Sequence, residues 1–172
     1  LAPRDAYRAQ IIDVKKAIAW VKTHIEEYGG DPDFVIVTGG SAGGHLSLLA
    51  GLTSGHADWQ VGFEGVDTAV QGVLAMYPVV DLTNRHGIRQ QARMDGFISR
   101  KIIQQTREAA LEVFEDGSPI SWIHRKGVAE SAPPFFIVQG AHDSLVWVEE
   151  VRGFVAEFAP LTRVPLVYAE LP

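Results

Sequence analysis

One serine, which lies within a run of glycine and alanine residues, is the strongest candidate for a catalytic residue. The run is Gly39-Gly40-Ser41-Ala42-Gly43-Gly44. The apolar stretch 34–38 before it is typical of a buried strand, and the apolar stretch 45–52 after it is typical of a helix. A serine at a sharp strand-to-helix turn has a strained backbone, so its neighbours must be small. Such a turn exposes the hydroxyl above the sheet, so the pattern predicts that Ser41 is a nucleophile.

The residue after the serine supplies the second part of this chemistry. Backbone N–H groups at a helix N-terminus stabilise the negative charge that develops on an attacked carbonyl oxygen. Ala42 directly follows the serine, so its N–H is the expected oxyanion donor. The glycines expected to permit the turn are Gly39, Gly40, Gly43 and Gly44. The alternative is an ordinary glycine-rich turn with a capping serine, whereas a phosphate-binding loop lacks its Gly-Lys-Ser/Thr.

A carboxylate that could orient a histidine base follows a later apolar stretch. Asp143 comes a short turn after residues 135–138, which puts it at the carboxyl end of a predicted strand. There it can orient a histidine and stabilise the histidine cation. Two alternatives stay open, because Asp143 could cap the next helix and Asp81 also follows a predicted strand.

The elements around these residues alternate between helix and strand. Apolar residues recur at helical spacing in residues 11–28, and the strand-like stretches are 34–38, 70–76, 135–138 and 164–168. The predicted solvated face of the first helix carries Asp13, Lys15, Lys16, Lys22, Glu26 and Glu27. The order predicts an α/β fold, with a mostly parallel sheet and helices on both of its faces.

One charged segment interrupts this alternation. Residues 81–131 hold eight of the fifteen Lys and Arg residues, with helical stretches near 88–115. Because sheet-like stretches lie on both sides, we predict an inserted helical cap. Its apolar residues would either line an acyl pocket or pack the cap onto the body: Phe97, Ile98, Ile102, Ile103 and Trp122.

Composition excludes several kinds of protein. The 172 residues are 47% apolar and 21% charged, which argues for a folded domain. The net charge of −6 argues against nucleic acid as the main partner. The absence of cysteine excludes disulfides, thiolate catalysis and cysteine-ligated metals. No apolar run is long enough to span a membrane, and the compartment stays open.

Several short motifs resemble one enzyme family. They are residues 13–21, the Gly-Gly-Ser-Ala-Gly-Gly-His-Leu run, Tyr77-Pro78-Val79-Val80-Asp81, Ser118-Pro119-Ile120 and residues 136–143. Together they resemble the α/β-hydrolase esterases and lipases, nearest to the hormone-sensitive-lipase-like carboxylesterases. Gly40 departs from that branch, which usually has Asp there. The resemblance covers nearly the whole chain and implies an α/β-hydrolase fold with an inserted cap.

The resemblance also implies an activity. Ser41 would attack a carboxylic ester and form an acyl-enzyme, with Asp143 as the acid and Asp81 as a structural residue. A small-molecule ester is then the partner, and no metal or organic cofactor is needed. The alternatives are an amidase, peptidase or formamidase on the same fold, or a non-catalytic hydrolase-like binding module.

Two parts of the family's machinery have no counterpart in residues 1–172. The family's histidine lies beyond its last strand, and its other oxyanion donors come from an upstream His-Gly-Gly-Gly loop. None of the six histidines fits the base: His24, His45, His56, His86, His124 and His142. We therefore expect a partial catalytic domain over 1–172, the second half of the sheet, with 34–38 as a bare edge strand and the rest of the domain as its partner.

Overall fold

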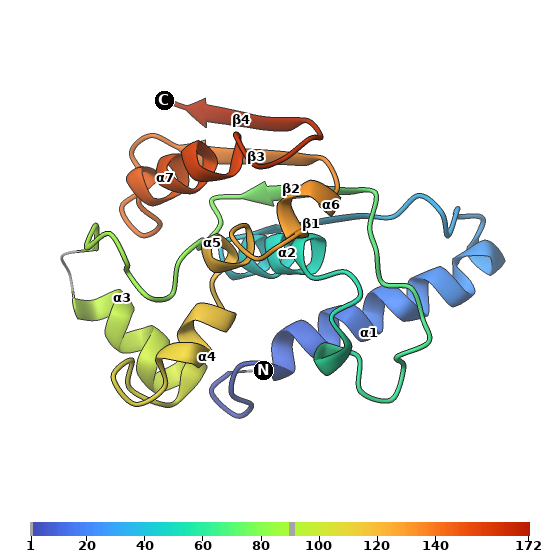
Figure 1. The fold of residues 1–172 in the computed structure, drawn as a ribbon, viewed down its shortest axis with the longest axis horizontal. Helices are drawn as coiled ribbons and strands as arrows, with labels where there is room; N and C mark the ends of the chain where they lie inside the picture. The colour runs from blue at the N-terminus through green and yellow to red at the C-terminus, as the bar shows by residue number, and fades with distance from the viewer. Residues whose placement is uncertain (1, 90–91) are drawn as a thin grey trace.

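The computed structural model describes residues 2–89 and 92–172 (Figure 1). Helices and strands alternate, as predicted. The helices are α1 (Ala9–His24), η1 (Ile25–Tyr28), α2 (Ala42–Leu52), η2 (Ala57–Trp59), α3 (Ala92–Phe97), the π-helical η3 (Ile98–Ile103), α4 (Leu111–Asp116), α5 (Pro119–Trp122), α6 (Val128–Ser131) and α7 (Val148–Phe158). The strands are β1 (Ile36–Gly40), β2 (Gly72–Met76), β3 (Phe135–Gly140) and β4 (Leu166–Leu171).

The strands form one parallel sheet in the order β1-β2-β3-β4. This confirms the predicted parallel sheet and places β1 at its edge. Three of the strands begin two residues later than apolarity alone suggested, at 36, 72 and 166. Near the start of β1 the reason is visible, because the Val35 N–H donates to the side chain of Gln71 at 2.8 Å instead of to a strand carbonyl.

Helices pack on one face of this sheet. Val73, Ala75, Phe135 and Ile137 form one buried cluster with residues of both α2 and α7, so these two helices cover the same face. The opposite row contains the register Thr38–Leu74–Phe136–Val167. There Phe136 is 42% exposed and Val167 is 46% exposed. The prediction of helices on both faces is therefore wrong for the described residues.

Helix α1 contributes its apolar stripe to the core and ends as predicted. Ile11 and Ile18 are buried. Gly29 has φ +81°, and its N–H donates to the Glu26 carbonyl at 3.0 Å, which terminates the helical segment. The prediction that Lys15 lies on the solvated face is wrong, since its side chain is fully buried and its Nζ donates to the Thr53 carbonyl. Burial lowers the pKa of Lys15 to about 8.

The segment between β2 and β3 is helical, as expected, and carries a small core of its own. This core consists of Leu82, Ile98, Ile103 and Phe114. The helical stretch predicted near 88–115 includes residues 90–91, which lie outside the described residues. After residue 119 the segment joins the main core, where Ile120, Trp122 and Ile123 are buried.

Candidate active site

Ser41 lies between the last residue of β1 and the first residue of α2. Its backbone has φ 53° and ψ −115°, a region that non-glycine residues rarely adopt. Its N–H donates to the Met76 carbonyl at 3.0 Å, and its carbonyl accepts from the His45 N–H at 2.9 Å. These two bonds tie the turn to β2 and to the first turn of α2. The expected strand, turn and helix around the serine are therefore present. The two hydrogen bonds hold Ser41 in its strained backbone conformation.

Two of the predicted glycines are required by close backbone packing. A Cβ on Gly39 would lie 2.5 Å from the carbonyl carbon of Gly43, and one on Gly44 would lie 2.9 Å from the Met76 oxygen. At Gly43, no described atom outside its own helical backbone and chain neighbours lies within 4 Å of an added Cβ, so close packing among the described residues does not require a glycine there. At Gly40 the obstacle is a side chain, that of Tyr77, 2.4 Å from an added Cβ.

The backbone N–H of Ala42 is placed as expected for an oxyanion donor. Ala42 is the first residue of α2 and is exposed. The first N–H groups of a helix have no acceptor within the helix. Within the described part of the chain, no other group accepts from this N–H. It can therefore donate to an oxygen bound next to Ser41.

Asp143 lies in the turn between β3 and α7, at the same carboxyl edge of the sheet as Ser41. Its Oδ1 accepts from the N–H groups of Leu145 at 2.8 Å and Val146 at 2.9 Å. Among the described residues, nothing donates to its Oδ2. Asp143 does not cap α7, whose N-cap residue is Trp147 and has no side-chain cap bond. Its Oδ1 fixes the turn before the helix, and its Oδ2 can accept from a histidine.

The competing carboxylate, Asp81, is engaged on both oxygens. It is buried, and Oδ1 accepts from the N–H and hydroxyl of Thr83 at 2.7 and 2.6 Å. Its Oδ2 accepts from the Arg85 N–H at 2.8 Å. These bonds hold its own loop in place, and they agree with the structural role that the resemblance implied.

Five histidine side chains of the described chain hydrogen-bond to or pack on groups other than Ser41 and Asp143. His45 is buried, and its Nδ1 bonds to the Val79 carbonyl at 2.8 Å, with burial lowering the pKa of the ring to about 4. His86 and His124 both bond to Glu157, at 2.9 and 2.7 Å. His56 packs on Trp59 and Trp122, His24 bonds to the Trp20 carbonyl, and His142 is exposed. In residues 2–89 and 92–172, no histidine hydrogen-bonds to Ser41 or Asp143.

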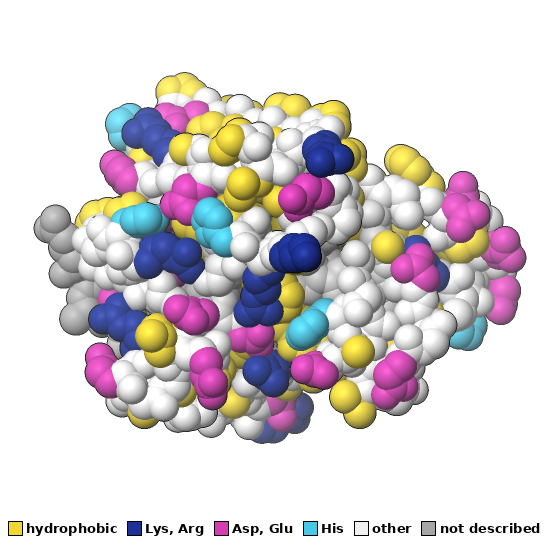
Figure 2. Space-filling model, in the orientation of Figure 1, with side chains coloured by type: hydrophobic (Ala, Val, Ile, Leu, Met, Phe, Trp, Pro, Cys, Tyr) yellow, Lys and Arg dark blue, Asp and Glu magenta, His cyan; other side chains and the backbone are white. Residues whose placement is uncertain are grey.

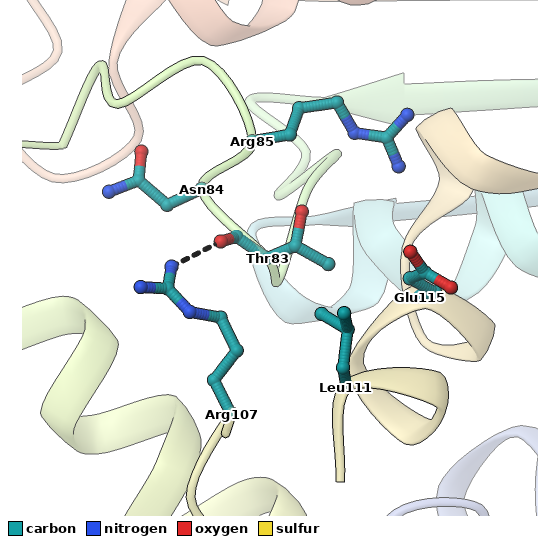
Figure 3. Close-up of a pocket in the computed structure, with 6 residues that line it drawn as sticks. All are labelled: Thr83, Asn84, Arg85, Arg107, Leu111 and Glu115. Carbon is teal, nitrogen blue, oxygen red and sulfur yellow. Dashed lines mark hydrogen bonds between the residues drawn. The ribbon is translucent and has the colours of Figure 1, made fainter. Parts of the chain in front are cut away.

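A cavity of about 520 Å³ lies in the segment between β2 and β3 (Figure 3). It is lined by Thr83, Asn84, Arg85, Arg107, Leu111 and Glu115. Figure 3 shows the Arg107 guanidinium directed at the Thr83 carbonyl, to which it donates at 2.5 Å. The lining is mostly polar, so this cavity is not the expected acyl pocket.

The candidate acyl-pocket residues mostly pack the fold. Ile98 and Ile103 are buried in the small core between β2 and β3, and Trp122 is buried in the main core. Phe97 is exposed, and Ile102 packs against the small core. For the buried three, the packing alternative is correct.

Among the described residues, neither the charged side chains nor the potential metal ligands form a further site. Figure 2 shows Lys and Arg side chains interspersed with Asp and Glu over the viewed face. Across the described ranges, no group of three His, Cys, Asp or Glu residues could hold a metal ion. No described helix is long and apolar enough to cross a membrane.

A parallel sheet with a strained serine between a strand and a glycine-rich helix start defines an α/β-hydrolase fold. The chain belongs to the BD-FAE family, whose family model matches residues 1–158. This confirms the resemblance to α/β-hydrolase esterases.

Curated relatives and solved structures agree with this family. The chain is 46% identical to the probable carboxylic ester hydrolase LipM of Mycobacterium tuberculosis, over 99% of this chain and 38% of that protein. It is 41% identical to esterase LipQ of the same organism, over 99% of this chain and 39% of LipQ. The chain thus spans about two fifths of the length of these relatives.

Among solved structures, a truncated carbohydrate esterase from gut microbiota aligns with TM-score 0.81 at 22% identity, covering 97% of this chain and 61% of that one. A butyrate-bound thermophilic esterase of Thermogutta terrifontis aligns with TM-score 0.68 at 25% identity, covering 94% and 54%. Both support the fold.

One residue at the turn was not singled out as a site residue by its sequence. Tyr77 has a positive φ and contacts Gly40, whereas its sequence shows it only as part of a family motif. The only signal was its position directly after a predicted strand, because neither backbone strain nor a contact across strands can be read from composition.

Proposed function

We propose that the protein carrying this sequence hydrolyses carboxylic esters through an acyl-enzyme on Ser41. The observation that carries the proposal is the strained serine turn, held by Met76 and His45, with the Ala42 N–H beside it. A strained and half-buried serine of this kind has little structural use in a surface turn. The names of the curated relatives support the same reaction class.

The reaction follows from these groups. A histidine base takes the proton from Ser41 Oγ as Oγ bonds to the ester carbonyl carbon. The electron pair of the carbonyl moves to its oxygen, where the Ala42 N–H stabilises the charge. The carbon–alkoxy bond then breaks, and the alcohol leaves with the proton held by the histidine. Water attacks the acyl-enzyme in the same way, which releases the acid and restores Ser41.

We further propose that residues 1–172 are part of a larger catalytic domain whose other segments supply the histidine and the second oxyanion donor. Three observations support this. No histidine among the described residues hydrogen-bonds to Ser41, one sheet face is exposed, and the relatives are more than twice as long. Asp143 would hold that histidine through its Oδ2.

The test is covalent labelling of the protein expressed from its complete reading frame. We expect a fluorophosphonate probe to add once, on the peptide that contains Ser41, and p-nitrophenyl acetate to be hydrolysed. The variant Ser41→Ala should lose both, whereas Ser54→Ala, at an exposed serine after α2, should keep both. Labelling without turnover of esters, but with turnover of aryl amides, would identify an amidase instead. A protein that neither labels nor hydrolyses would be a non-catalytic member of the fold.

A further inference from the structure

Gln139 is a polar residue at a position of β3 that faces the core. Strand alternation puts its side chain on the same side as Phe135 and Ile137, which belong to the buried cluster shared with α2 and α7. The Gln139 side chain is itself fully buried. A buried amide is unfavourable unless it is hydrogen-bonded, so the partner of Gln139 indicates what the residue does.

This partner lies at the far end of the turn that carries Asp143. Gln139 Nε2 donates to the Val146 carbonyl at 2.9 Å, seven residues further along the chain. The same nitrogen lies 3.4 Å from the Gly140 carbonyl, which is a weaker contact. Val146 directly precedes Trp147, the N-cap residue of α7. Gln139 therefore connects the end of β3 to the beginning of α7 across the turn.

Val146 links Gln139 to the Asp143 carboxylate. The Val146 N–H donates to Asp143 Oδ1 at 2.9 Å, and the Leu145 N–H donates to the same oxygen at 2.8 Å. Two donors on one oxygen fix the orientation of the carboxylate, and the position of Oδ2 follows from that orientation. The direction in which Asp143 presents Oδ2 thus depends on where Gln139 holds Val146.

Packing alone does not account for a glutamine at this position. Gln139 Oε1 is buried, and no described group donates to it. A buried acceptor without a donor is unfavourable, and an apolar side chain of similar size would leave no such oxygen. The favourable contribution of the amide is therefore its bond to the Val146 carbonyl, at the turn that holds Asp143.

We propose that Gln139 is a positioning residue, which acts through Val146 to hold Asp143 with its Oδ2 directed at the histidine base. The inference rests on the proposed function, with Asp143 as the acid. The histidine must accept this orientation from Asp143 while it also reaches Ser41. A displacement of about 1 Å in such an arrangement can lower the rate about 100-fold. Loss of the Gln139 bond should therefore lower kcat more than it changes KM, because a buried side chain does not contact the ester.

The test compares two buried glutamines in the protein expressed from its complete reading frame. Gln60 is the matched control, since it is buried and its Nε2 donates to the Val66 carbonyl at 2.9 Å, in the loop after α2. Gln139→Met and Gln60→Met should both lower the unfolding midpoint. Only Gln139→Met should lower kcat for p-nitrophenyl acetate, by roughly 10- to 100-fold at nearly constant KM. Equal effects of the two variants on kcat would overturn the inference, because they would show that Gln139 contributes only to stability.

The pH dependence of kcat/KM gives a second readout, which a loss of stability does not change. A well-oriented carboxylate favours the protonated form of the histidine. Gln139→Met should therefore shift the midpoint of the rise in kcat/KM to lower pH, whereas Gln60→Met should leave it in place. Gln139→Glu keeps the shape of the side chain, and its carboxyl can donate to the Val146 carbonyl only while it is protonated. Its kcat, relative to that of the wild type at the same pH, should fall as pH rises.

A double variant tests whether Gln139 acts through Asp143. Gln139→Met should lower kcat far less in the Asp143→Asn background than in the wild type, because the orienting charge is already absent. Effects that multiply in full, or wild-type kcat in both Gln139 variants at every pH, would overturn this inference alone. A protein that neither labels at Ser41 with a fluorophosphonate nor hydrolyses the ester would overturn the proposed function and this inference with it.

Discussion

The two aspartates near the carboxyl edge of the sheet differ in how their oxygens are used. Both oxygens of Asp81 accept hydrogen bonds from backbone N–H groups of its own loop, so the carboxylate stabilises the local fold. In Asp143 only Oδ1 accepts such bonds, from the turn before α7. A carboxylate that orients a histidine needs one oxygen fixed and one free to accept. At the level of single residues, Asp143 meets this requirement and Asp81 does not.

This difference predicts opposite phenotypes for the two conservative variants. Asp143→Asn keeps an oxygen for the Leu145 and Val146 N–H groups, so the unfolding midpoint should hold, while kcat falls roughly 10³- to 10⁴-fold because the histidine loses its orienting charge. Asp81→Asn leaves a buried N–H group facing the Arg85 N–H, so we expect a loss of about 1–3 kcal/mol in unfolding free energy. Denaturant unfolding and initial rates separate the two. If only Asp81→Asn lost activity, Asp81 and not Asp143 would be the residue that orients the histidine.

The residue scale also shows what sequence can and cannot predict. Ser41 and its strand–turn–helix setting were predictable, because few residue types tolerate such a turn. The charge of Lys15 led to the wrong prediction that it is exposed. Its spacing, four residues after Ile11 and three before Ile18, places it on the buried face of α1. Tyr77 could not be found, since its significance lies in a contact with Gly40 across two strands.

Among the elements, α7 is joined to the segment between β2 and β3 by a buried ion pair. Arg89 Nη1 donates to Glu150, in the first turn of α7, and Arg89 Nε contacts Asp95 at 2.7 Å. The Arg89 guanidinium also donates to the Asp81 carbonyl at 2.6 Å. Element type and order followed from sequence periodicity. This junction did not, because it pairs residues 61 positions apart.

The buried carboxyl of Glu150 makes stability depend on pH. Burial, together with the nearby charges of Asp81 and Asp95, outweighs the attraction of Arg89 and raises the pKa of Glu150 from 4.5 to about 7. Between these values the folded state holds a proton that the unfolded chain has released. The unfolding free energy should therefore fall as pH rises from about 4.5 to 7, by at most on the order of 3 kcal/mol from this group.

Denaturant unfolding across this pH range checks the effect. Glu150→Gln replaces the titrating group by a neutral one of the same shape, so its stability should lie near that of the wild type at pH 4.5 and fall less as pH rises, which gives a flatter slope. Glu149→Gln, at the exposed neighbouring position on α7, is the matched control and should keep the slope. An undiminished slope in Glu150→Gln would show that another group titrates.

At the scale of the whole molecule, the sheet has one packed face and one exposed face. Sequence predicted a two-sided sheet because the strand stretches are apolar throughout, as doubly covered strands are. Strands of this composition are typical of a sheet covered on both faces, but none of the described helices covers the second face. The uncovered sheet face presents apolar side chains, and the free edge of β1 presents unpaired backbone groups. Together they favour association with another chain.

Residues 1–172 expressed alone should therefore self-associate at micromolar concentrations and bind a hydrophobic dye, whereas the product of the complete reading frame should do so far less. Light scattering and dye fluorescence measure both properties. Phe136→Lys and Val167→Lys together should reduce association of the shorter chain, because they place charges on the exposed sheet face. Leu111→Lys, at an exposed apolar residue of α4, should leave association unchanged. A monomeric 1–172 chain that unfolds cooperatively and binds no dye would contradict the larger domain proposed here, because its exposed sheet face would need no cover.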